Sequence, residues 1–391
     1  MALKNHIEFL TNKIGVRPPS SQAERNASVY IENQFKERGL ETGTLVYPAL
    51  RNYSWYYAVA YFLYPLAVMI YPSRPWLAAI LTFLATLFCR LDLYLWPGIV
   101  RAFAGSKMSQ TVLGRKPAYE ESRQIIFITA SYDSRKSYAV GTFINHYYYR
   151  LILISDILRS VQFIALTSGA VFTIFSLTHW SRIVWCITWP GSLLLTVMMA
   201  LELHRWLSGV WLSTINDNDS SVAVLIGLAE ELKQRPCQHC DVILAALGSE
   251  RDANLGMHKL LSLIEKGLRS TTDIINLEAV GGGKLRILGR EGISRPIPAT
   301  DDLIDLGYMI AKGLNMEFQE TEQVMIRTGG AIARSRGFRS VSLMGIDSDG
   351  LPCNFRETSK RSEKMALVKE EKLIGVVDII MQMIHLIDQQ V

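Results

Sequence analysis

Polar and acidic side chains stand directly after three predicted strands, at Ser131 to Asp133, Glu250 to Arg251 and Glu278. The strands that precede them are short, apolar and rich in β-branched residues. Because the carboxyl ends of parallel strands meet at one edge of a sheet, we expect these side chains to share one rim. Carboxylates grouped in this way can hold a metal ion, or they can move protons as general acids and bases.

The elements that must position this rim alternate between helix and strand. Strands are predicted at residues 110–114, 125–130, 242–247, 274–277 and 340–344. Helices are predicted from Ser20-Ser21 to Gly39 and at about 220–233, 254–268, 301–313 and 366–387. This order is typical of a three-layer α/β domain with a mostly parallel sheet.

An apolar region interrupts that domain. The 391-residue chain is 49% apolar and 20% charged, with a mean hydropathy of +0.16, and the apolar excess lies between residues 53 and 206. Tyr53–Tyr71 and Val161–Trp180 carry no charge over nineteen and twenty residues, close to the roughly 20 that cross a bilayer core. Trp76–Trp96 and Ile183–Leu201 complete two tight hairpins, so we predict four membrane spans. Buried core helices of a soluble protein are the alternative.

The two hairpins divide the chain into five predicted parts. The α/β domain takes residues 1–52, 98–159 and 207–391, and the transmembrane hairpins take residues 53–97 and 160–206. Two charged residues, Arg90 and Asp92, lie near the end of the second span. Charges at bilayer depth are costly and generally paired, so they indicate a partner, although Arg90 at a helix end can also extend to the headgroups.

Basic residues flank the predicted spans unevenly. The hairpin tips carry only Arg74 and Arg182. The opposite ends carry six basic residues, Arg51, Arg101, Lys107, Arg150, Arg159 and Arg205. The positive-inside rule therefore predicts an integral protein of the inner or plasma membrane whose soluble domain is cytoplasmic. The net charge of +5 is largely accounted for by these flanks, and we do not expect nucleic acid as a partner.

Four segments share their order of residue types with one enzyme family. They are Gly15-Val-Arg-Pro-Pro-Ser-Ser-Gln-Ala-Glu-Arg, Asn216-Asp-Asn-Asp-Ser-Ser-Val-Ala-Val-Leu, Gly248-Ser-Glu-Arg-Asp-Ala-Asn-Leu-Gly and Ile275-Asn-Leu-Glu-Ala-Val-Gly. They resemble motifs of the zinc aminopeptidases of clan MH, whose relatives include glutamate carboxypeptidase, glutaminyl cyclase and the transferrin receptor. The resemblance covers nearly all of the chain outside the hairpins. It implies a sheet of the aminopeptidase type that carries two zinc ions at its rim.

The resemblance also implies a role for several rim residues. Asp217 matches the carboxylate that bridges the two zinc ions, and Glu250 matches the general base. Glu278 stands at a ligand position where the family has a shorter Asp, and it retains a carboxylate that can coordinate. Asp133 matches the Asp that supports a histidine ligand of the family.

Three other ligand positions are lost. Ser131 and Arg356 stand where the family has histidines, and Arg251 stands where it has a carboxylate. A guanidinium stays protonated in proteins and cannot become a metal ligand. We therefore predict that zinc-dependent activity is lost and that no cofactor is held. Arg251 and Arg356 can instead supply the missing positive charge as ion pairs with the remaining carboxylates.

Three functions are compatible with these patterns. The first, which we predict, is an inactive aminopeptidase-like membrane protein that serves as a scaffold or binding subunit, with the lipid bilayer and other membrane-protein subunits as partners. The second is a membrane-bound metallopeptidase or related hydrolase with a reduced site, in which Asp217, Glu278, Asp133 and Glu250 hold one zinc ion. The third is a transporter component, which the few polar residues in the spans make improbable.

Overall fold

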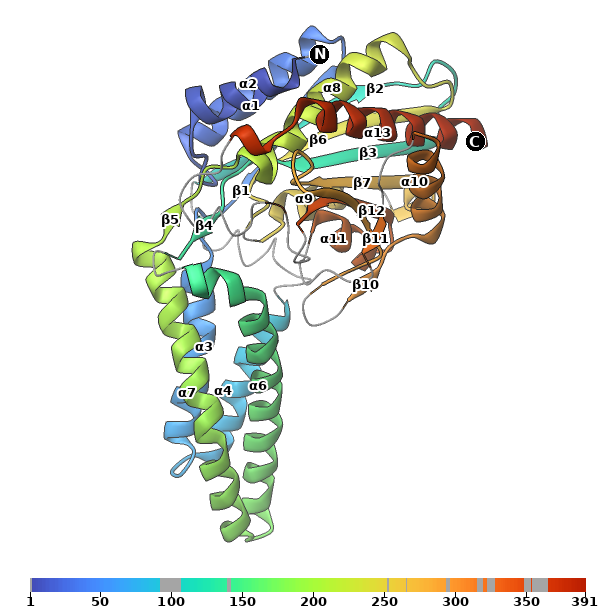
Figure 1. Ribbon diagram of the computed structural model, residues 1–391. Helices are drawn as coiled ribbons and strands as arrows, with labels where there is room; N and C mark the ends of the chain where they lie inside the picture. Colours follow the sequence, from blue (N-terminus) through green and yellow to red (C-terminus); the bar gives the residue numbers. More distant parts are fainter. Residues whose placement is uncertain are drawn as a thin grey trace. The chain divides into compact units, whose positions relative to one another are not determined.

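The computed structural model describes residues 2–91, 107–138, 142–251, 253–264, 266–292, 296–314, 319–321, 328–347, 353 and 365–391. These residues form two compact units (Figure 1). The α/β unit comprises Met1–Arg51, Val100–Arg135 and Trp211–Val391, and the helical unit comprises Asn52–Ile99 and Lys136–Val210. Both predicted hairpins fall in the helical unit. Each unit is described by itself.

The α/β unit is built on an eight-stranded sheet. In spatial order the strands are β1 (Glu41–Pro48), β2 (Met108–Lys116), β6 (Cys240–Leu247), β3 (Gln124–Ser131), β7 (Thr272–Glu278), β12 (Arg339–Ile346), β8 (Lys284–Leu288) and β11 (Gln319–Thr321). The central strands β6, β3, β7 and β12 are parallel, while β2 and β8 run antiparallel to the central strands beside them. The mostly parallel sheet predicted from the sequence is confirmed.

Helices cover both faces of this sheet, as the three-layer prediction requires. One face carries α1 (Leu3–Glu8), α2 (Gln22–Glu37), α8 (Ser220–Gln234), α10 (Asp301–Gly313) and α13 (Glu370–Gln390). The other face carries α9 (Leu255–Leu263) and α11 (Gly329–Ser335). The remaining short elements are π-helical turns at Phe9–Ile14 and Ile215–Asp219, 3-10 turns at Lys266–Leu268 and Met365–Leu367, and strands β4 (Lys136–Ser137), β5 (Val210–Trp211), β9 (Arg290–Glu291) and β10 (Ile297–Pro298).

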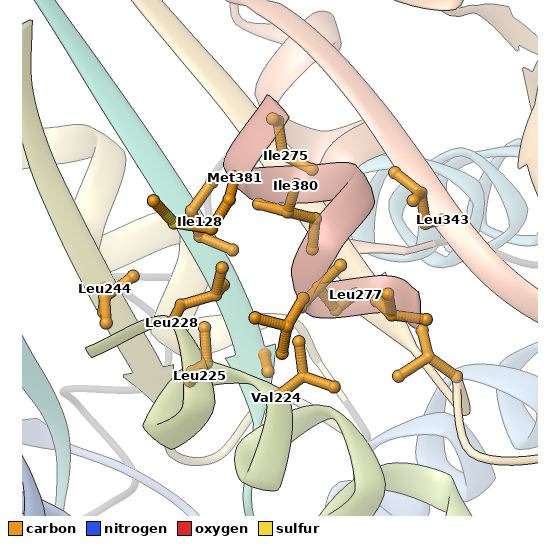
Figure 2. Packing of buried hydrophobic residues seen from close by; sticks show 14 of the residues in the cluster. Ile128, Val224, Leu225, Leu228, Leu244, Ile275, Leu277, Leu343, Ile380 and Met381 are labelled. Atoms are coloured by element: carbon orange, nitrogen blue, oxygen red, sulfur yellow. The ribbon is translucent and has the colours of Figure 1, made fainter. Parts of the chain in front are cut away.

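The main core lies between the central strands and helices α8 and α13. Figure 2 shows apolar side chains of both helices directed at those of the strands, namely Val224, Leu225, Leu228, Ile380 and Met381 against Ile128, Leu244, Ile275, Leu277 and Leu343. The central strands are covered on both faces, which is why β3 and β6 contain continuous apolar runs rather than alternating patterns. Helix α8 is buried along most of its length, and its apolar residues accordingly surround the helix.

In the part of the helical unit that the structure describes, four helices form a bundle, α3 (Ser54–Ile70), α4 (Pro75–Leu91), α6 (Thr142–Ile174) and α7 (Thr178–Ser208). Helix α3 packs against α4 and α7, and α6 packs against the same two helices (Figure 1). Two segments, Arg150–Ile174 and Thr178–Ser208, are long and apolar enough to cross a membrane. Helices α3 and α4 are apolar but shorter, with 17 residues each.

The second hairpin begins earlier along the chain than the predicted boundary at residue 160. Helix α6 is already regular at Thr142, inside the part predicted to belong to the α/β domain. The first turns of α6 contain charged residues such as Arg150 and Asp156. These residues lie before the uncharged run of the sequence, but the helical backbone continues through them. The apolar run therefore marks only part of this helix.

Candidate functional site

The carboxyl ends of the central strands meet at the edge where the rim was predicted. Ser131, the last residue of β3, pairs in register with Leu247, the last residue of β6. Its neighbour Ala130 pairs with Leu277, which precedes Glu278 at the end of β7. The turn at Ile215–Asp219, just before α8, adds Asp217 to this edge.

Arg251 lies between two of the rim carboxylates. Its Nη2 atom is 2.6 Å from Oδ1 of Asp217, and its Nη1 atom donates to Oε2 of Glu278 over 3.2 Å. None of the three side chains is more than 14% exposed. Charge-assisted contacts of this kind are stronger than neutral hydrogen bonds, and the low exposure limits screening by water. The guanidinium therefore supplies the positive charge at the centre of the rim.

The pKa of Glu278 is shifted because its carboxyl is buried beside other charged groups. The pKa of Glu278 is raised to about 7, chiefly by burial; the Arg251 guanidinium lowers this pKa, and the nearby charge of Asp217 raises it. Asn276 Nδ2 contacts Oε1 of Glu278 at 3.4 Å. A single arginine thus balances carboxylates that would otherwise repel each other.

Glu250 is tied to the start of helix α9. Its Oε1 atom accepts from Asn254 Nδ2 at 3.1 Å, and its Oε2 atom accepts from the backbone N–H of Met257 at 2.9 Å. Met257 is in the first turn of α9, so the Glu250 carboxyl caps that helix. Burial raises the pKa of Glu250 to about 8, although these two donors lower it. Both carboxyl oxygens of Glu250 are thus engaged by donors of the chain itself.

Two buried side chains hold the loops of the rim together. Asp133 accepts from the backbone N–H groups of Glu250 and Arg251, both at 3.1 Å. Asn218 donates to Leu277 O at 3.0 Å and to Ser131 Oγ at 3.2 Å. The backbone positions of the rim are therefore set by hydrogen bonds that need no metal ion.

Comparisons with known proteins agree on the fold. No protein-family model and no curated protein matches the chain. Similar solved structures include the zinc aminopeptidase BSAP of Bacillus subtilis (TM-score 0.56, 12% identity, 98% of this chain and 93% of that chain) and an aminopeptidase from Aneurinibacillus sp. strain AM-1 (0.55, 13%, 98% and 92%). A glutaminyl cyclase from an Acidobacteriales bacterium is similar as well (0.54, 12%, 100% and 94%).

The fold is that of the zinc aminopeptidases and glutaminyl cyclases. The rim residues of this chain, however, do not fit the zinc ions that the fold implies. Arg251 places a permanent positive charge between Asp217 and Glu278, and the Ser131 hydroxyl is engaged by Asn218. Among the described residues, no three His, Cys, Asp or Glu side chains are arranged to share a metal ion. Arg356 lies outside the described residues.

Arg17 and Asp219 form a buried pair behind the rim to which the sequence analysis assigned no role. Arg17 is fully buried and is in ionic contact with Asp219, two residues after Asp217. It also donates to Tyr132 O at 2.7 Å and to Leu10 O at 2.8 Å. Burial raises the pKa of Asp219 to about 6, although Arg17 lowers it. Arg17 and Asp219 both belong to segments that resemble the family. That resemblance was the only feature of the sequence that could have indicated a role for them.

Glu24 is a second buried group that fixes the rim. Its Oε1 atom accepts from Ser109 Oγ at 2.6 Å and from Ser249 N at 3.2 Å, and its Oε2 atom accepts from Ser20 N at 2.6 Å. Through Ser249 it holds the loop that continues into Glu250 and Arg251. Burial raises the pKa of Glu24 to about 8.

This raised pKa predicts a pH effect on stability that Glu24→Gln should remove. The folded protein keeps a proton on Glu24 that the unfolded chain releases above pH 4.5, so Glu24 reduces stability as the pH rises toward about 8. The slope is at most about 1.4 kcal/mol per pH unit for one group. Thermal unfolding of both proteins from pH 5 to 8.5 should show a flatter profile for Glu24→Gln. Parallel profiles would contradict this assignment.

The charged residues predicted near the end of the second span are only partly described. Arg90 lies at the end of helix α4, its side chain is outside the described residues, and so is Asp92. The structure adds a pair that the sequence analysis did not identify. Asp156 and Arg159, three residues apart on α6, are in ionic contact in the helical unit.

Proposed function

We propose that this chain is a metal-free, catalytically inactive protein of the aminopeptidase fold that serves as a scaffold or binding subunit in a membrane complex. The observation that carries this proposal is the position of Arg251 between Asp217 and Glu278. The guanidinium provides charge neutralisation that zinc provides in such a site, and it cannot polarise a water molecule as a Lewis acid does. In this proposal the rim keeps its carboxylates but no longer uses them to hold zinc or to catalyse hydrolysis.

The state of Glu250 supports the same proposal. A base that activates water must be deprotonated and must point toward the reacting atoms. The buried Glu250 carboxyl accepts hydrogen bonds on both oxygens, from Asn254 on Oε1 and from Met257 on Oε2. The residue at the position of the general base acts here as a structural cap for α9.

The membrane part of the proposal is supported by the side chains of the helical unit. Large apolar residues are exposed on every helix, for example Phe62 on α3, Phe83 on α4, Ile164 on α6 and Leu193 on α7. Exposed apolar surface of this extent is unfavourable in water and is typical of helices in contact with lipid. We infer four spans in an inner or plasma membrane. The basic residues at the ends opposite the hairpin tips favour a cytoplasmic α/β unit.

The metal content of the purified full-length protein tests the proposal. We expect far less than one zinc ion per chain by elemental mass spectrometry after dialysis against buffer with trace zinc. The variants Asp217→Ala and Glu278→Ala serve as matched controls and should give the same background. One zinc ion per wild-type chain that either variant loses would overturn the proposal. That result would instead indicate a membrane-bound hydrolase with a reduced metal site.

A further inference from the structure

The two helical hairpins contact each other through polar side chains that the proposed scaffold function does not use. Tyr61 Oη on α3 lies 2.9 Å from Ser155 Oγ on α6. The guanidinium of Arg159 lies 5.3 Å from the centroid of the Tyr61 ring, within the range of a cation–π contact, and it also pairs with Asp156. Tyr61 therefore joins the first hairpin to the buried charge of the second.

A second set of polar contacts lies at the hairpin tips. Tyr71 Oη, at the end of α3, is 2.9 Å from Ser181 Oγ on α7. Trp185 Nε1 on α7 donates to the backbone carbonyl of Val68 at 2.8 Å. That carbonyl has no helical donor four residues later, because Pro72 lacks an N–H group. The Trp185 indole of the second hairpin therefore donates to the Val68 carbonyl of the first hairpin, which lacks its usual helical donor.

Close packing at the same point depends on a glycine of α6. A β-carbon built on Gly169 would lie 2.1 Å from Tyr71 Oη and 3.1 Å from Val184 Cγ1. Any side chain there would displace the tyrosine from Ser181. Helices α3, α6 and α7 thus meet at a site that only glycine permits.

Several polar residues of the bundle are buried, whereas most of the large exposed side chains along its helices are apolar. Buried interior positions include Thr82 on α4, Gln162 on α6, and Thr188 and Ser192 on α7. Large apolar side chains more than a third exposed are Val59, Phe62, Met69, Trp76, Leu77, Ile80, Phe83, Leu84, Leu87, Ile154, Ile157, Val161, Ile164, Ile174, Trp180, Ile187, Trp189, Leu193, Val197, Leu203, Trp206 and Leu207. Helices associate in membranes through small and polar residues, which this outer surface presents sparsely.

We propose that the bundle is a self-contained membrane domain in which each hairpin is the partner of the other and lipid acyl chains cover the outer surface. This inference rests on the membrane location in the proposed function and deepens it. A protein partner of the scaffold then binds the α/β unit, because Tyr61, Tyr71 and Trp185 direct their polar groups to the other hairpin rather than to the outer surface.

A double-mutant cycle on the full-length protein in lipid nanodiscs tests the contact between hairpins. Tyr71→Phe and Ser181→Ala should each lower the unfolding temperature by about 2 °C, because each removes the same hydrogen bond from an apolar environment. The double variant should lose no more than the larger single loss. Phe62→Leu and Phe83→Leu, on the exposed surface, are the matched controls and should leave the temperature unchanged. Additive losses, or no loss in either single variant, would overturn the inference.

The number of copies of the chain per disc tests whether lipid or another copy covers the outer surface of the bundle. Single-molecule photobleaching of the labelled full-length protein, in discs formed directly from cell membranes, should show one copy per disc. Several copies that Phe83→Ala separates would overturn the inference.

Alkaline carbonate extraction checks the membrane location independently, and we expect the chain to remain in the pellet. Release into the supernatant would remove the membrane part of the proposed function, while the cycle at Tyr71 and Ser181 would still report whether the hairpins contact each other.

Discussion

Replacing Arg251 by glutamate should lower the free energy of unfolding by about 3 kcal/mol, the lower end of the range for breaking a buried ion pair because the site is slightly exposed. The change removes the cation that contacts Asp217 and Glu278 and adds a carboxylate beside them. The hydrogen bond from the backbone N–H of residue 251 to Asp133 keeps the new side chain on the same loop, beside the other carboxylates. Chemical denaturation of the full-length protein in detergent measures the loss.

Two variants separate this effect from a general change of charge. Arg235→Glu alters the same charge at an exposed helix end, where Arg235 only contacts Glu231 at 3.7 Å, and it should cost less than about 0.5 kcal/mol. Arg251→Met should cost less than Arg251→Glu, since Glu278 can take up a proton once the arginine is absent. Added zinc should restore part of the loss in Arg251→Glu and leave the wild type unchanged. Equal stability of wild type and Arg251→Glu would refute the role assigned to the arginine.

The centre of the sheet could be predicted from the sequence because burial determines its composition. Strands covered on both faces are mostly apolar, and the runs at 125–130, 242–247 and 274–277 have this character. Strand β1 was not predicted, because it is at the edge of the sheet and half of its residues are exposed. An edge strand needs no apolar run. The position of β1 in the sheet is set by its pairing with β2, and strand pairing cannot be read from amino-acid composition.

The same limit applies to the candidate site. The sequence motifs placed Asp217, Glu250 and Glu278 near one another, since each follows a strand or precedes a helix at the same edge. They did not reveal that Glu250 accepts a hydrogen bond from Met257 in α9, which depends on a side-chain rotamer. The pairing of Asp156 with Arg159 was missed for a related reason. Their spacing permits a contact on one helix face, but the predicted span began after them.

The supporting contacts of the rim explain how ligand residues can be exchanged while the fold persists. Asp133 holds the loop of residues 250 and 251, and Asn218 joins the ends of β3 and β7. Glu24 holds the same loop from the other side through Ser249. Most of these bonds go to backbone groups and do not use the side chain at position 251, whereas the bond from Asn218 to Ser131 Oγ does use the side chain at position 131. A site supported in this way can lose its metal ligands and keep its shape.

Arg17→Met should cause the largest loss of stability in this support, about 3–5 kcal/mol, because it leaves Asp219 buried without its cation. The substitution also removes the donors to the carbonyl oxygens of Tyr132 and Leu10, which are satisfied by the guanidinium. Methionine retains the unbranched apolar part of the side chain but is shorter than arginine, so the loss includes some packing as well as charge and hydrogen bonding. Chemical denaturation at pH 7 measures it.

The pH dependence of this loss identifies its cause. Burial already raises the pKa of Asp219 to about 6, and removal of Arg17 should raise it further. The folded variant then holds a proton that the unfolded chain releases above pH 3.8, so the deficit should grow as the pH rises from 5 to 8. Adding Asp219→Asn to Arg17→Met removes the unpaired charge and should recover part of the stability at pH 8. A deficit that is independent of pH and unaffected by Asp219→Asn would mean that Arg17 stabilises the rim through its hydrogen bonds to backbone carbonyls rather than through its charge.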